Sequence, residues 1–303
     1  MYKYCLAIFF IFSFSNVSSQ VKWKNVDSLY QPLPSSMHVY FTNEKLDTGA
    51  FRAYYLVADL KDKQLDFTTD TTFKRRLTPQ QFFEKNNKPL LVINGTFFSF
   101  ETNQNLNVVV KDGHLLGYNV RQARSKTDTT KFINEPMTRG VIGIDKKRNA
   151  DIAWISADST MRFPNAYEAF PSADTTVASH KWKMKTAIGG GPVLLQNGNV
   201  VITNNQEKMF AGKAINDKHP RTCIGYTADH KIIIMVIEGR NEKGSGATLI
   251  QEAKLLQDLS CIEGLNLDGG GSSCMLINGK PTINVSDKTG QRPVPAVFII
   301  KRK

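Results

Sequence analysis

The stretch Leu265-Asn266-Leu267-Asp268-Gly269-Gly270-Gly271-Ser272-Ser273-Cys274-Met275-Leu276 sets three glycines and two serines between two apolar runs. This order is typical of a strand, a sharp loop and a second strand. Because glycine lacks a Cβ, such a loop can adopt positive φ and let a ligand approach its backbone, and its bare N–H groups can surround an anion. A plain turn is the alternative. The carboxylate of Asp268 at the strand mouth, with the amide of Asn266 and the hydroxyls of Ser272 and Ser273 beside it, favours a binding site.

The N-terminus predicts a secretory signal peptide over residues 1–19. Lys3 precedes a short apolar run, residues 5–12, and small residues follow at 17–19. The apolar run is too short to cross a bilayer, and no later run approaches its length. We therefore expect cleavage of this peptide, a secreted or periplasmic location, and no membrane span.

Composition limits the classes of partner. The net charge is +12, but the lysines and arginines are scattered rather than gathered in one basic tract. Such a charge favours anionic ligands in general and gives little support to nucleic acid, so we expect a small-molecule or glycan partner. Cys223, Cys261 and Cys274 lack C-x-x-C spacing, which argues against a disulfide framework or a zinc site. Buried thiols are expected, and a single Cys261–Cys274 bridge stays open.

The pattern of apolar runs predicts an α+β fold with a mixed, largely antiparallel β-sheet core and few helices. Thr78 with Gln81, and Thr248 with Gln251, have the spacing of capping boxes and predict two helix starts. Residues 20–50 lack clear periodicity and are interpreted as an extended N-terminal lead-in, and residues 51–303 as one domain. The expected strands and turns are residues 51–60, 90–93, 140–144, 152–155, 222–226, 232–237 and 296–300, with tight turns at Asp112–Gly113 and Asn197–Gly198.

Four loops share one design, in which an apolar strand ends in a polar tip that contains glycine. They are Asn94–Phe98, Gly189–Pro192, Glu238–Arg240 and Asn266–Ser273. Loops at strand ends are where rigid scaffolds commonly carry function, so we expect them to meet. Each loop taken alone can also be interpreted as an ordinary turn or as a surface ion pair. Gly189–Pro192 lacks the Lys-Ser/Thr of a P-loop and the spacing of a dinucleotide fingerprint, which excludes a nucleotide cradle there.

Together with Arg221, these loops resemble the phosphodiester glycosidase family. The resemblance covers about residues 51–300, and its longest motif is specific. In two places the chain departs from the family pattern: Cys274 replaces the usual threonine, and Glu238 stands where aspartate is common. The matching segments are, in chain order, Asn94–Phe98, Gly189–Leu194, Pro220–Thr222 with Gly225, Glu238–Arg240, Gly246–Leu249, Leu265–Ser273, Asn278–Gly279 and Arg292–Val294.

The resemblance implies a hydrolase that cleaves the glycosidic bond of sugar-1-phosphodiesters, of the N-acetylglucosamine-1-phosphodiester kind, and releases sugar and a phosphomonoester. Two alternatives stay open. One is a non-catalytic sugar-phosphate or polysaccharide-binding protein, and the other is a phosphodiesterase that cuts P–O. Glycosidases usually employ two carboxyl groups, and Asp268 and Glu238 are the expected catalytic pair.

The leaving group makes the expected site asymmetric. A phosphomonoester has a second pKa of about 6, so it needs little protonation but strong cationic stabilisation. Asp268 is the favoured base or nucleophile, and Glu238 is expected to orient Arg240 or a sugar hydroxyl. Arginine binds phosphate bidentately, which makes Arg221 and Arg240 the candidates there.

The remaining candidates would hydrogen-bond the sugar or shape the loops around it. No cofactor is predicted, and a divalent cation stays open because Asp268 and Glu238 offer oxygen ligands. The expected substrate-binding residues are Asn94, Thr96, Gly190, Gly191, Arg221, Thr222, Arg240, Asn266, Gly269, Gly270, Ser272 and Ser273.

Overall fold

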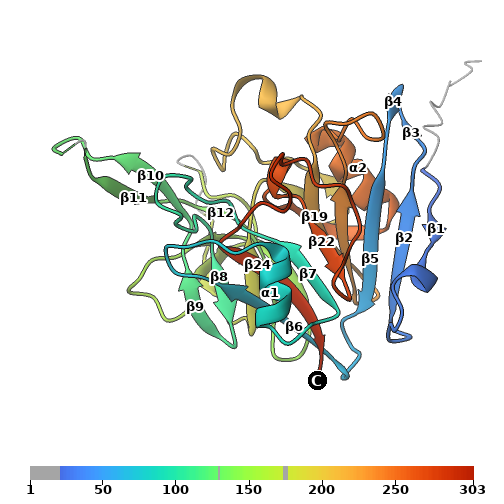
Figure 1. Cartoon of the computed structure of the whole chain (residues 1–303). Coiled ribbons are helices and arrows are strands. Elements are labelled where there is room, and N and C mark those ends of the chain that lie inside the picture. The colour runs from blue at the N-terminus through green and yellow to red at the C-terminus, as the bar shows by residue number, and fades with distance from the viewer. Residues whose placement is uncertain (1–20, 129, 173–176) are drawn as a thin grey trace, which may run out of the picture.

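Three antiparallel β-sheets surround a common core in the computed structural model, which describes residues 21–128, 130–172 and 177–303 (Figure 1). The predicted signal peptide, residues 1–19, lies outside the described residues. Every pairing between the named strands is antiparallel, with two short α-helices on the outside of the sheets. The prediction of an α+β fold with a largely antiparallel sheet core and few helices is confirmed, and within the described part the sheets are not mixed.

The eight-stranded sheet supplies one wall. Its central strand β20 is buried at every position from Ile232 to Ile237, as the uninterrupted apolar run predicted. In spatial order the sheet consists of β1 (Lys24–Asn25), β2 (Met37–Thr42), β5 (Ala53–Asp59), β20 (Lys231–Ile237), β19 (Arg221–Thr227), β21 (Cys261–Asn266), β17 (Val193–Gln196) and β18 (Asn199–Val200).

Two further sheets and two hairpins complete the strands. The five-stranded sheet runs β23 (Lys280–Pro281), β22 (Met275–Ile277), β7 (Leu91–Asn94), β24 (Ala296–Arg302) and β6 (Leu65–Thr71). The seven-stranded sheet runs β15 (His180–Lys181), β14 (Asn165–Tyr167), β13 (Ala150–Ser156), β12 (Arg139–Ile144), β16 (Thr186–Gly189), β8 (Val109–Lys111) and β9 (His114–Gly117). The hairpins are β3 (Lys45–Leu46) with β4 (Gly49–Ala50), and β10 (Val120–Arg124) with β11 (Phe132–Pro136).

The largest hydrophobic cluster joins the three sheets. It contains Leu56 of β5, Ile93 of β7 and Ile142 of β12, each almost completely buried. Burial of aliphatic side chains at about 25 cal/mol per Å² is the main favourable term in folding. Because each sheet contributes one apolar face to this cluster, the ends of their strands are held in fixed relative positions.

The two helices start where the capping boxes predicted. In α1 (Pro79–Lys85) and α2 (Leu249–Asp258), the capping threonines Thr78 and Thr248 accept from the backbone of Gln81 and Gln251, whose side chains bond back. Three 3₁₀ turns are also present, at Asp27–Leu29, Gly212–Ile215 and Gly270–Ser272. Helix α2 covers one face of the eight-stranded sheet, and α1 packs on β7 and β22 (Figure 1).

Within the predicted lead-in, the described residues 21–50 contain strands. β2 pairs along its whole length with β5, and β1 pairs with β2, so this segment extends the eight-stranded sheet. The alternation in Met37–Thr42 is imperfect because this strand lies near the sheet edge and is only half-buried at several positions. Cys223, Cys261 and Cys274 are free and buried, as expected, and no Cys261–Cys274 bridge forms.

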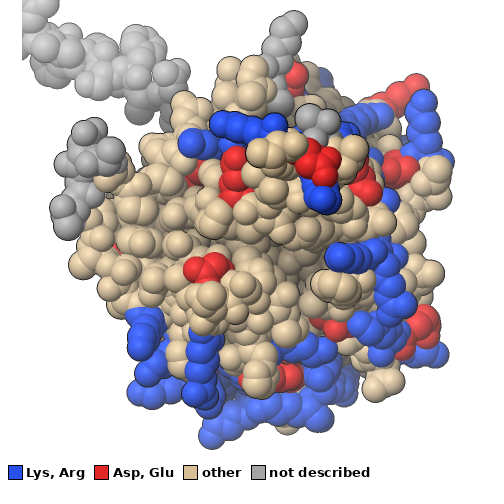
Figure 2. Space-filling model, turned by 90° about the vertical axis from the view of Figure 1, so that its left-hand side faces the viewer, with Lys and Arg blue, Asp and Glu red and all other residues tan. Residues whose placement is uncertain are grey.

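The face on which β10 and β11 project has an uneven charge distribution. Figure 2 shows lysine and arginine side chains gathered along the lower edge of this face, whereas its middle carries few charged groups.

Within the described residues, no helix is long and apolar enough to cross a membrane.

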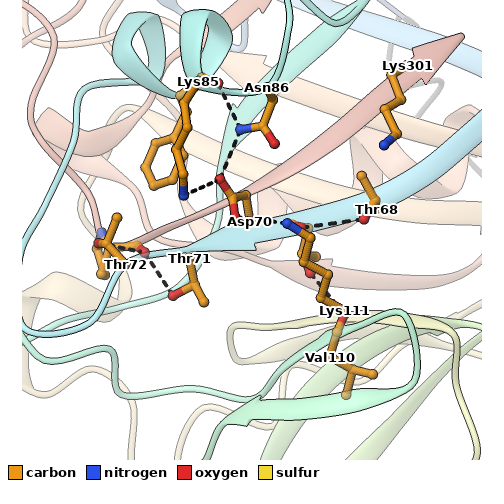
Figure 3. Close-up of polar contacts among 12 residues, drawn as sticks. Thr68, Asp70, Thr71, Thr72, Lys85, Asn86, Val110, Lys111 and Lys301 are labelled. Atoms are coloured by element: carbon orange, nitrogen blue, oxygen red, sulfur yellow. Dashed lines mark hydrogen bonds and ion pairs between the residues drawn. The ribbon is translucent and has the colours of Figure 1, made fainter.

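A buried carboxylate joins two sheets and a helix (Figure 3). Asp70 of β6 lies between Lys85 and Asn86 at the end of α1 and Lys111 of β8, with N···O distances of 2.7, 2.9 and 3.1 Å. Burial alone would raise the pKa of Asp70, but the hydrogen bonds from these three side chains lower it below its usual value of 3.8. The ionised form is therefore the stable one in the folded protein.

We expect Asp70→Asn to lower the free energy of unfolding by roughly 1–3 kcal/mol at pH 7, because hydrogen bonds to a charged group are lost. A depressed carboxyl pKa stabilises the fold above the unfolded value and ceases to do so as the pH falls through the folded value. Urea unfolding at pH 7 and pH 3 should show the deficit shrinking in acid. Glu101→Gln, which removes an exposed 3.7 Å pair with Arg124, is the control and should change little. An equal deficit at both pH values would contradict this role for Asp70.

Candidate functional site

The polar loops at the strand ends meet, as backbone hydrogen bonds between them show. The N–H of Asp268 donates to the carbonyl of Gly95 at 2.8 Å, and the N–H of Gly270 donates to the carbonyl of Pro220 at 2.8 Å. The N–H of Gly191 donates to the carbonyl of Asn266, also at 2.8 Å. The loop after β21 is thus in direct contact with the loops after β7 and β16 and with the residues before β19.

Two glycines of the central loop are required by its shape. Gly270 has φ of +60°, a conformation that glycine adopts without strain. A Cβ on Gly271 would lie 2.1 Å from Nη2 of Arg292, so only glycine allows this guanidinium to rest on the loop. Gly269 lies against the carbonyl of Pro220.

The second glycine segment is held by side-chain amides. The Nδ2 of Asn266 donates to the carbonyl of Gly191 at 2.7 Å, and the Nδ2 of Asn107 donates to the carbonyl of Gly190 at 3.1 Å. The carbonyl groups of Gly190 and Gly191 therefore serve as anchors for the loop. Asn107 was not among the predicted site residues, since nothing in its local sequence marks it.

Asp268 occupies the centre of these contacts. Its Oδ2 is buried and has no hydrogen-bond partner among the described residues. Burial raises the pKa of Asp268 to about 7, although the neighbouring Ser272 hydroxyl, the Arg292 guanidinium and the N–H of Gly269 act in the opposite direction. A carboxyl group with a pKa near 7 can exchange a proton at neutral pH, as catalytic acids and bases must.

Unpartnered polar atoms gather around Asp268. Buried polar groups in folded proteins are nearly always hydrogen-bonded, and exceptions call for a ligand, water or strain. The loops after β7 and β21 contribute a group of such exceptions, all buried and without a hydrogen-bond partner in the described part of the chain. They are Thr96 Oγ1, Asn266 Oδ1, Asp268 Oδ2, Ser272 Oγ and Ser273 Oγ.

The side chains of Asn94 and Thr222 support the loop that follows β21. The Nδ2 of Asn94 donates to the backbone carbonyl of Asp268 at 2.6 Å, and its Oδ1 accepts from Thr222 Oγ1 at 2.9 Å and from the N–H of Cys274 at 3.0 Å. Asn94 and Thr222 are fully buried. Together they hold the Asp268 backbone in position, and the hydrogen bond from Asn94 to a sugar hydroxyl stays a prediction.

Glu238 is buried and fully paired. Its carboxylate accepts from Asn241 Nδ2 at 3.0 Å and from the N–H and Nδ2 of Asn284, each at 3.1 Å, and forms an ion pair with Arg52 at 3.3 Å. These bonds fasten the turn after β20 to the segment that leads towards β24. No contact between Glu238 and Arg240 is among these bonds, so the role expected of Glu238 in orienting Arg240 or a sugar hydroxyl stays a prediction.

Two guanidinium groups border the glycine loop. A Cβ on Gly270 would lie 3.2 Å from Nη2 of Arg240, and Arg240 also lies 3.3 Å from Nδ1 of His219. Burial, aided by Arg221 and Arg240, lowers the pKa of His219, which favours the neutral ring that can accept from Arg240. Arg292 packs on Gly271 and pairs with Asp287 at 2.7 Å.

Arg221, one of the two arginines predicted to bind phosphate, is almost completely buried. Its Nε donates to the carbonyl of Ala247 at 3.0 Å, and its guanidinium stacks on Phe210 at 5.7 Å. Burial lowers the pKa of Arg221, while the carboxyl group of Glu252 on α2 raises it. Only a small part of Arg221 is exposed, so little of its guanidinium is open to a ligand.

Arg292 is the main residue that sequence reasoning left without a role. It lies in the Arg292–Val294 segment that carried part of the family resemblance, so a signal was present. Its guanidinium and that of Arg76 each lie 5.3 Å from the Phe100 ring. Neither Arg76 nor Phe100 has a local sequence signal, because their proximity arises only from tertiary packing.

The carboxylates do not form an evident metal cluster. Among residues 21–128, 130–172 and 177–303, no group of three or more His, Cys, Asp or Glu side chains is arranged to hold a metal ion. Of the two oxygen donors considered from the sequence, Glu238 is already committed to Asn241, Asn284 and Arg52.

The curated relatives match in short segments. A prophage-derived uncharacterised protein of Bacillus subtilis, YomE, is 40% identical over 73 residues, which is 24% of this chain and 11% of YomE. The N-acetylglucosamine-1-phosphodiester alpha-N-acetylglucosaminidase of Mus musculus is 30% identical over 94 residues, which is 28% of this chain and 18% of the mouse protein. The match thus spans less than a fifth of the length of either relative.

Solved structures share the fold over nearly the whole chain. The catalytic domain of the zebrafish N-acetylglucosamine-1-phosphodiester alpha-N-acetylglucosaminidase, auto-inhibited by its pro-peptide, superimposes with a TM-score of 0.63 at 18% identity and covers 94% of this chain and 89% of the zebrafish chain. A hypothetical protein from Synechocystis gives a TM-score of 0.62 at 14% identity, over 93% of this chain and 64% of its own. A family model described as phosphodiester glycosidase matches residues 87–301, so this chain belongs to the phosphodiester glycosidase family.

Proposed function

We propose that this protein is a secreted or periplasmic hydrolase that cleaves the bond between the anomeric carbon of a sugar and a phosphodiester. The single observation that carries the proposal is Asp268, a carboxyl group with a pKa of about 7 set among unpartnered buried hydroxyl and amide oxygens. The predicted signal peptide supports the location, and the names of the mouse and zebrafish relatives support N-acetylglucosamine as the sugar.

The cationic side of the site suits the leaving group. Arg240 and Arg292 lie against neighbouring glycines of one loop, Gly270 and Gly271. An anion on this loop would meet two guanidinium groups, which bind phosphate through paired N–H donors. The departing phosphomonoester gains negative charge as the glycosidic bond breaks, and fixed cations stabilise that charge without reorganisation.

On the other side of the proposed site, the carboxyl group of Asp268 would act at the anomeric carbon. Since the leaving group needs little protonation, Asp268 acts as base towards water or as nucleophile. The hydroxyls of Ser272, Ser273 and Thr96 and the Oδ1 of Asn266 then complete their hydrogen bonds with the sugar and with water. Glu238 keeps the turn that carries Arg240 in place.

Hydrolysis in ¹⁸O-labelled water tests the bond that is cut. With N-acetylglucosamine 1-phosphodiesters and a panel of UDP-sugars as substrates, mass spectrometry should find the label in the released sugar, because water attacks carbon. Label in the phosphomonoester would identify a phosphodiesterase that cuts P–O. Saturable binding without product would identify a binding protein.

Asp268→Asn should lower kcat by at least about a hundredfold, since a general base or nucleophile is lost. It should also raise the melting temperature at pH 8 but not at pH 4. A carboxyl pKa raised from 3.8 to about 7 costs folding stability progressively as pH rises between these values, and asparagine removes this cost.

Glu263→Gln is the matched control for Asp268→Asn. Burial also raises the pKa of Glu263 to about 7, but its oxygens accept from Tyr226, Gln196 and the N–H of Ile152. This variant should keep most of its activity. A purely structural role for Asp268 would instead show as lower activity together with a lower melting temperature at both pH values.

Arg240→Ala should reduce kcat/KM for phosphodiester substrates by about tenfold to a hundredfold, the range for a lost charge-assisted hydrogen bond. Aryl glycosides, whose leaving groups carry no phosphate, should be affected much less. Steady-state kinetics on both substrate types measures the difference. Arg302→Ala, at the exposed far end of β24, is the control. An equal loss on both types would remove Arg240 from phosphate recognition.

A further inference from the structure

A hollow with an apolar floor and a cationic rim lies at one end of the seven-stranded sheet. It has a volume of about 790 Å³ and is enclosed by the β8–β9 turn, the β12–β13 turn, residues 161–163 and the two residues Lys183 and Met184 before β16. Strand β9, which forms part of its wall, lies at the lower left of Figure 1. We propose that this hollow binds the protein to the surface of a lipid bilayer that contains acidic phospholipids.

The floor of the hollow is apolar. Leu115 and Met184 line it and pack on the buried cluster that contains Trp182. Leu116, which is 48% exposed, and Phe163 line it as well. Adjoining apolar side chains at a protein surface are characteristic of a contact site, so the floor favours a partner with an apolar part.

Four cationic side chains line the same hollow. They are Lys146, Lys147, Arg162 and Lys183. Within the described part of the chain, none of them forms an ion pair with a carboxylate. Arg162 and Lys183 lie instead at the ring of Phe163, 5.3 and 5.8 Å from its centre. Their charges are therefore held at the edge of the apolar floor and are available to an anion.

The carboxyl groups of the hollow do not cancel this charge. Asp112 and Asp145 line the hollow, and Asp145 accepts from the N–H and the Nδ2 of Asn149 at 2.9 and 3.1 Å. One of the two carboxylates is thus already hydrogen-bonded within its own turn. The four cations outnumber the two carboxylates, so the hollow favours an anionic partner.

The combination of floor and rim selects among anionic partners. A polyanion without apolar groups would satisfy the cations but leave the floor in contact with water. An acidic phospholipid offers a phosphate to the rim and the upper part of its acyl chains to the floor. Lysine and arginine beside exposed apolar side chains are the pattern of proteins that lie on anionic membrane surfaces.

Backbone hydrogen bonds fix the walls of the hollow relative to one another. The N–H of Gly113 donates to the carbonyl of Lys185 at 2.8 Å, and the N–H of Lys185 donates to the carbonyl of Ile144 at 2.9 Å. The N–H of Trp182 donates to the carbonyl of Pro164, also at 2.9 Å. Because these segments are already ordered, little conformational freedom is lost when the hollow meets a bilayer.

The hollow and the loops around Asp268 lie at opposite ends of the same strands. Met184 lines the hollow directly before β16, and at the other end of β16 the N–H of Gly190 bonds the carbonyl of Gly140 at 3.0 Å. At about 3.3 Å per residue, the extended chain from Met184 to Gly190 covers roughly 20 Å. A bilayer bound at the hollow would therefore leave the glycine loops open to substrates on the side away from the lipid.

Sedimentation with vesicles tests the contact. Residues 20–303, which comprise every described element and lack the predicted signal peptide, are mixed with vesicles of phosphatidylcholine alone or of equal parts phosphatidylcholine and phosphatidylglycerol. We expect binding to the mixed vesicles only, and a fall of at least about tenfold in the partition coefficient between about 0.1 and 0.5 M salt, because salt screens the charges. Equal binding to both vesicles, or to neither, overturns the proposal.

Charge reversal tests whether the hollow is the region that binds. Lys146→Glu combined with Lys147→Glu should lower the partition coefficient by about tenfold or more. The matched control is Lys22→Glu combined with Lys24→Glu, which changes the net charge equally at exposed positions at the edge of the eight-stranded sheet. An equal loss in the control would show attraction by net charge alone and would overturn the assignment to the hollow.

Substitution of the floor separates a bilayer from a soluble polyanion. Leu116→Ser should lower the partition coefficient by about threefold or more, because less apolar surface enters the lipid. The same variant should leave binding to inorganic polyphosphate unchanged. Unchanged binding of Leu116→Ser to the mixed vesicles would identify a purely electrostatic site for a polyanion and would overturn the proposal.

A fluorescent label reports which side of the protein meets the lipid. Since Cys223, Cys261 and Cys274 are buried, an environment-sensitive dye can be attached at Leu116→Cys or, as the control, at Leu29→Cys, which replaces a side chain of 56% exposure. We expect the mixed vesicles to shift the emission of the label at position 116 to shorter wavelength and to leave that at position 29 unchanged. The reverse pattern, or equal shifts, overturns the proposed orientation.

Discussion

The side chain of Asn94 is the constraint on which the site depends. It lies at the end of β7 and bonds the backbone of Asp268, the hydroxyl of Thr222 in β19 and the N–H of Cys274 before β22. Two sheets therefore meet at one buried amide. A side-chain amide suits this position because it offers donors and acceptors in one plane. Loss of any of these bonds would leave a buried polar group unpaired, at a cost of about 1–3 kcal/mol.

Buried carboxylates in this protein fall into two kinds. Asp70 and Glu238 are surrounded by donors, and each joins segments that are distant in sequence. Glu207 is similar, with donors from Gly140 and Val193 at 2.8 Å each, and it fixes the strand that follows the second glycine segment. These groups stabilise the scaffold because their partners compensate for the lost water.

Asp268 differs because hydrogen bonds within the protein only partly replace the water that its carboxyl group loses on burial. Its Oδ2 lacks a partner, and burial raises its pKa to about 7. The fold tolerates this cost because Asn94 and the backbone contacts to Gly95 hold the loop from outside the carboxyl group. Perturbed titration in a polar, incompletely bonded setting is characteristic of functional sites, and in this protein it falls on the residue that precedes the three glycines.

The sequence by itself determined the local features and the identity of the site loops. Both capping boxes, the apolar strand β20, the Asp112–Gly113 turn and the glycine-rich loop depend on neighbouring residues, whose backbone preferences act over a few positions. Only the tertiary structure decided that β2 belongs to the large sheet, that Glu238 bonds Asn284, and that Arg292 rests on Gly271. These contacts depend on how strands far apart in the chain pair, and the pKa of Asp268 depends on the water that this packing excludes.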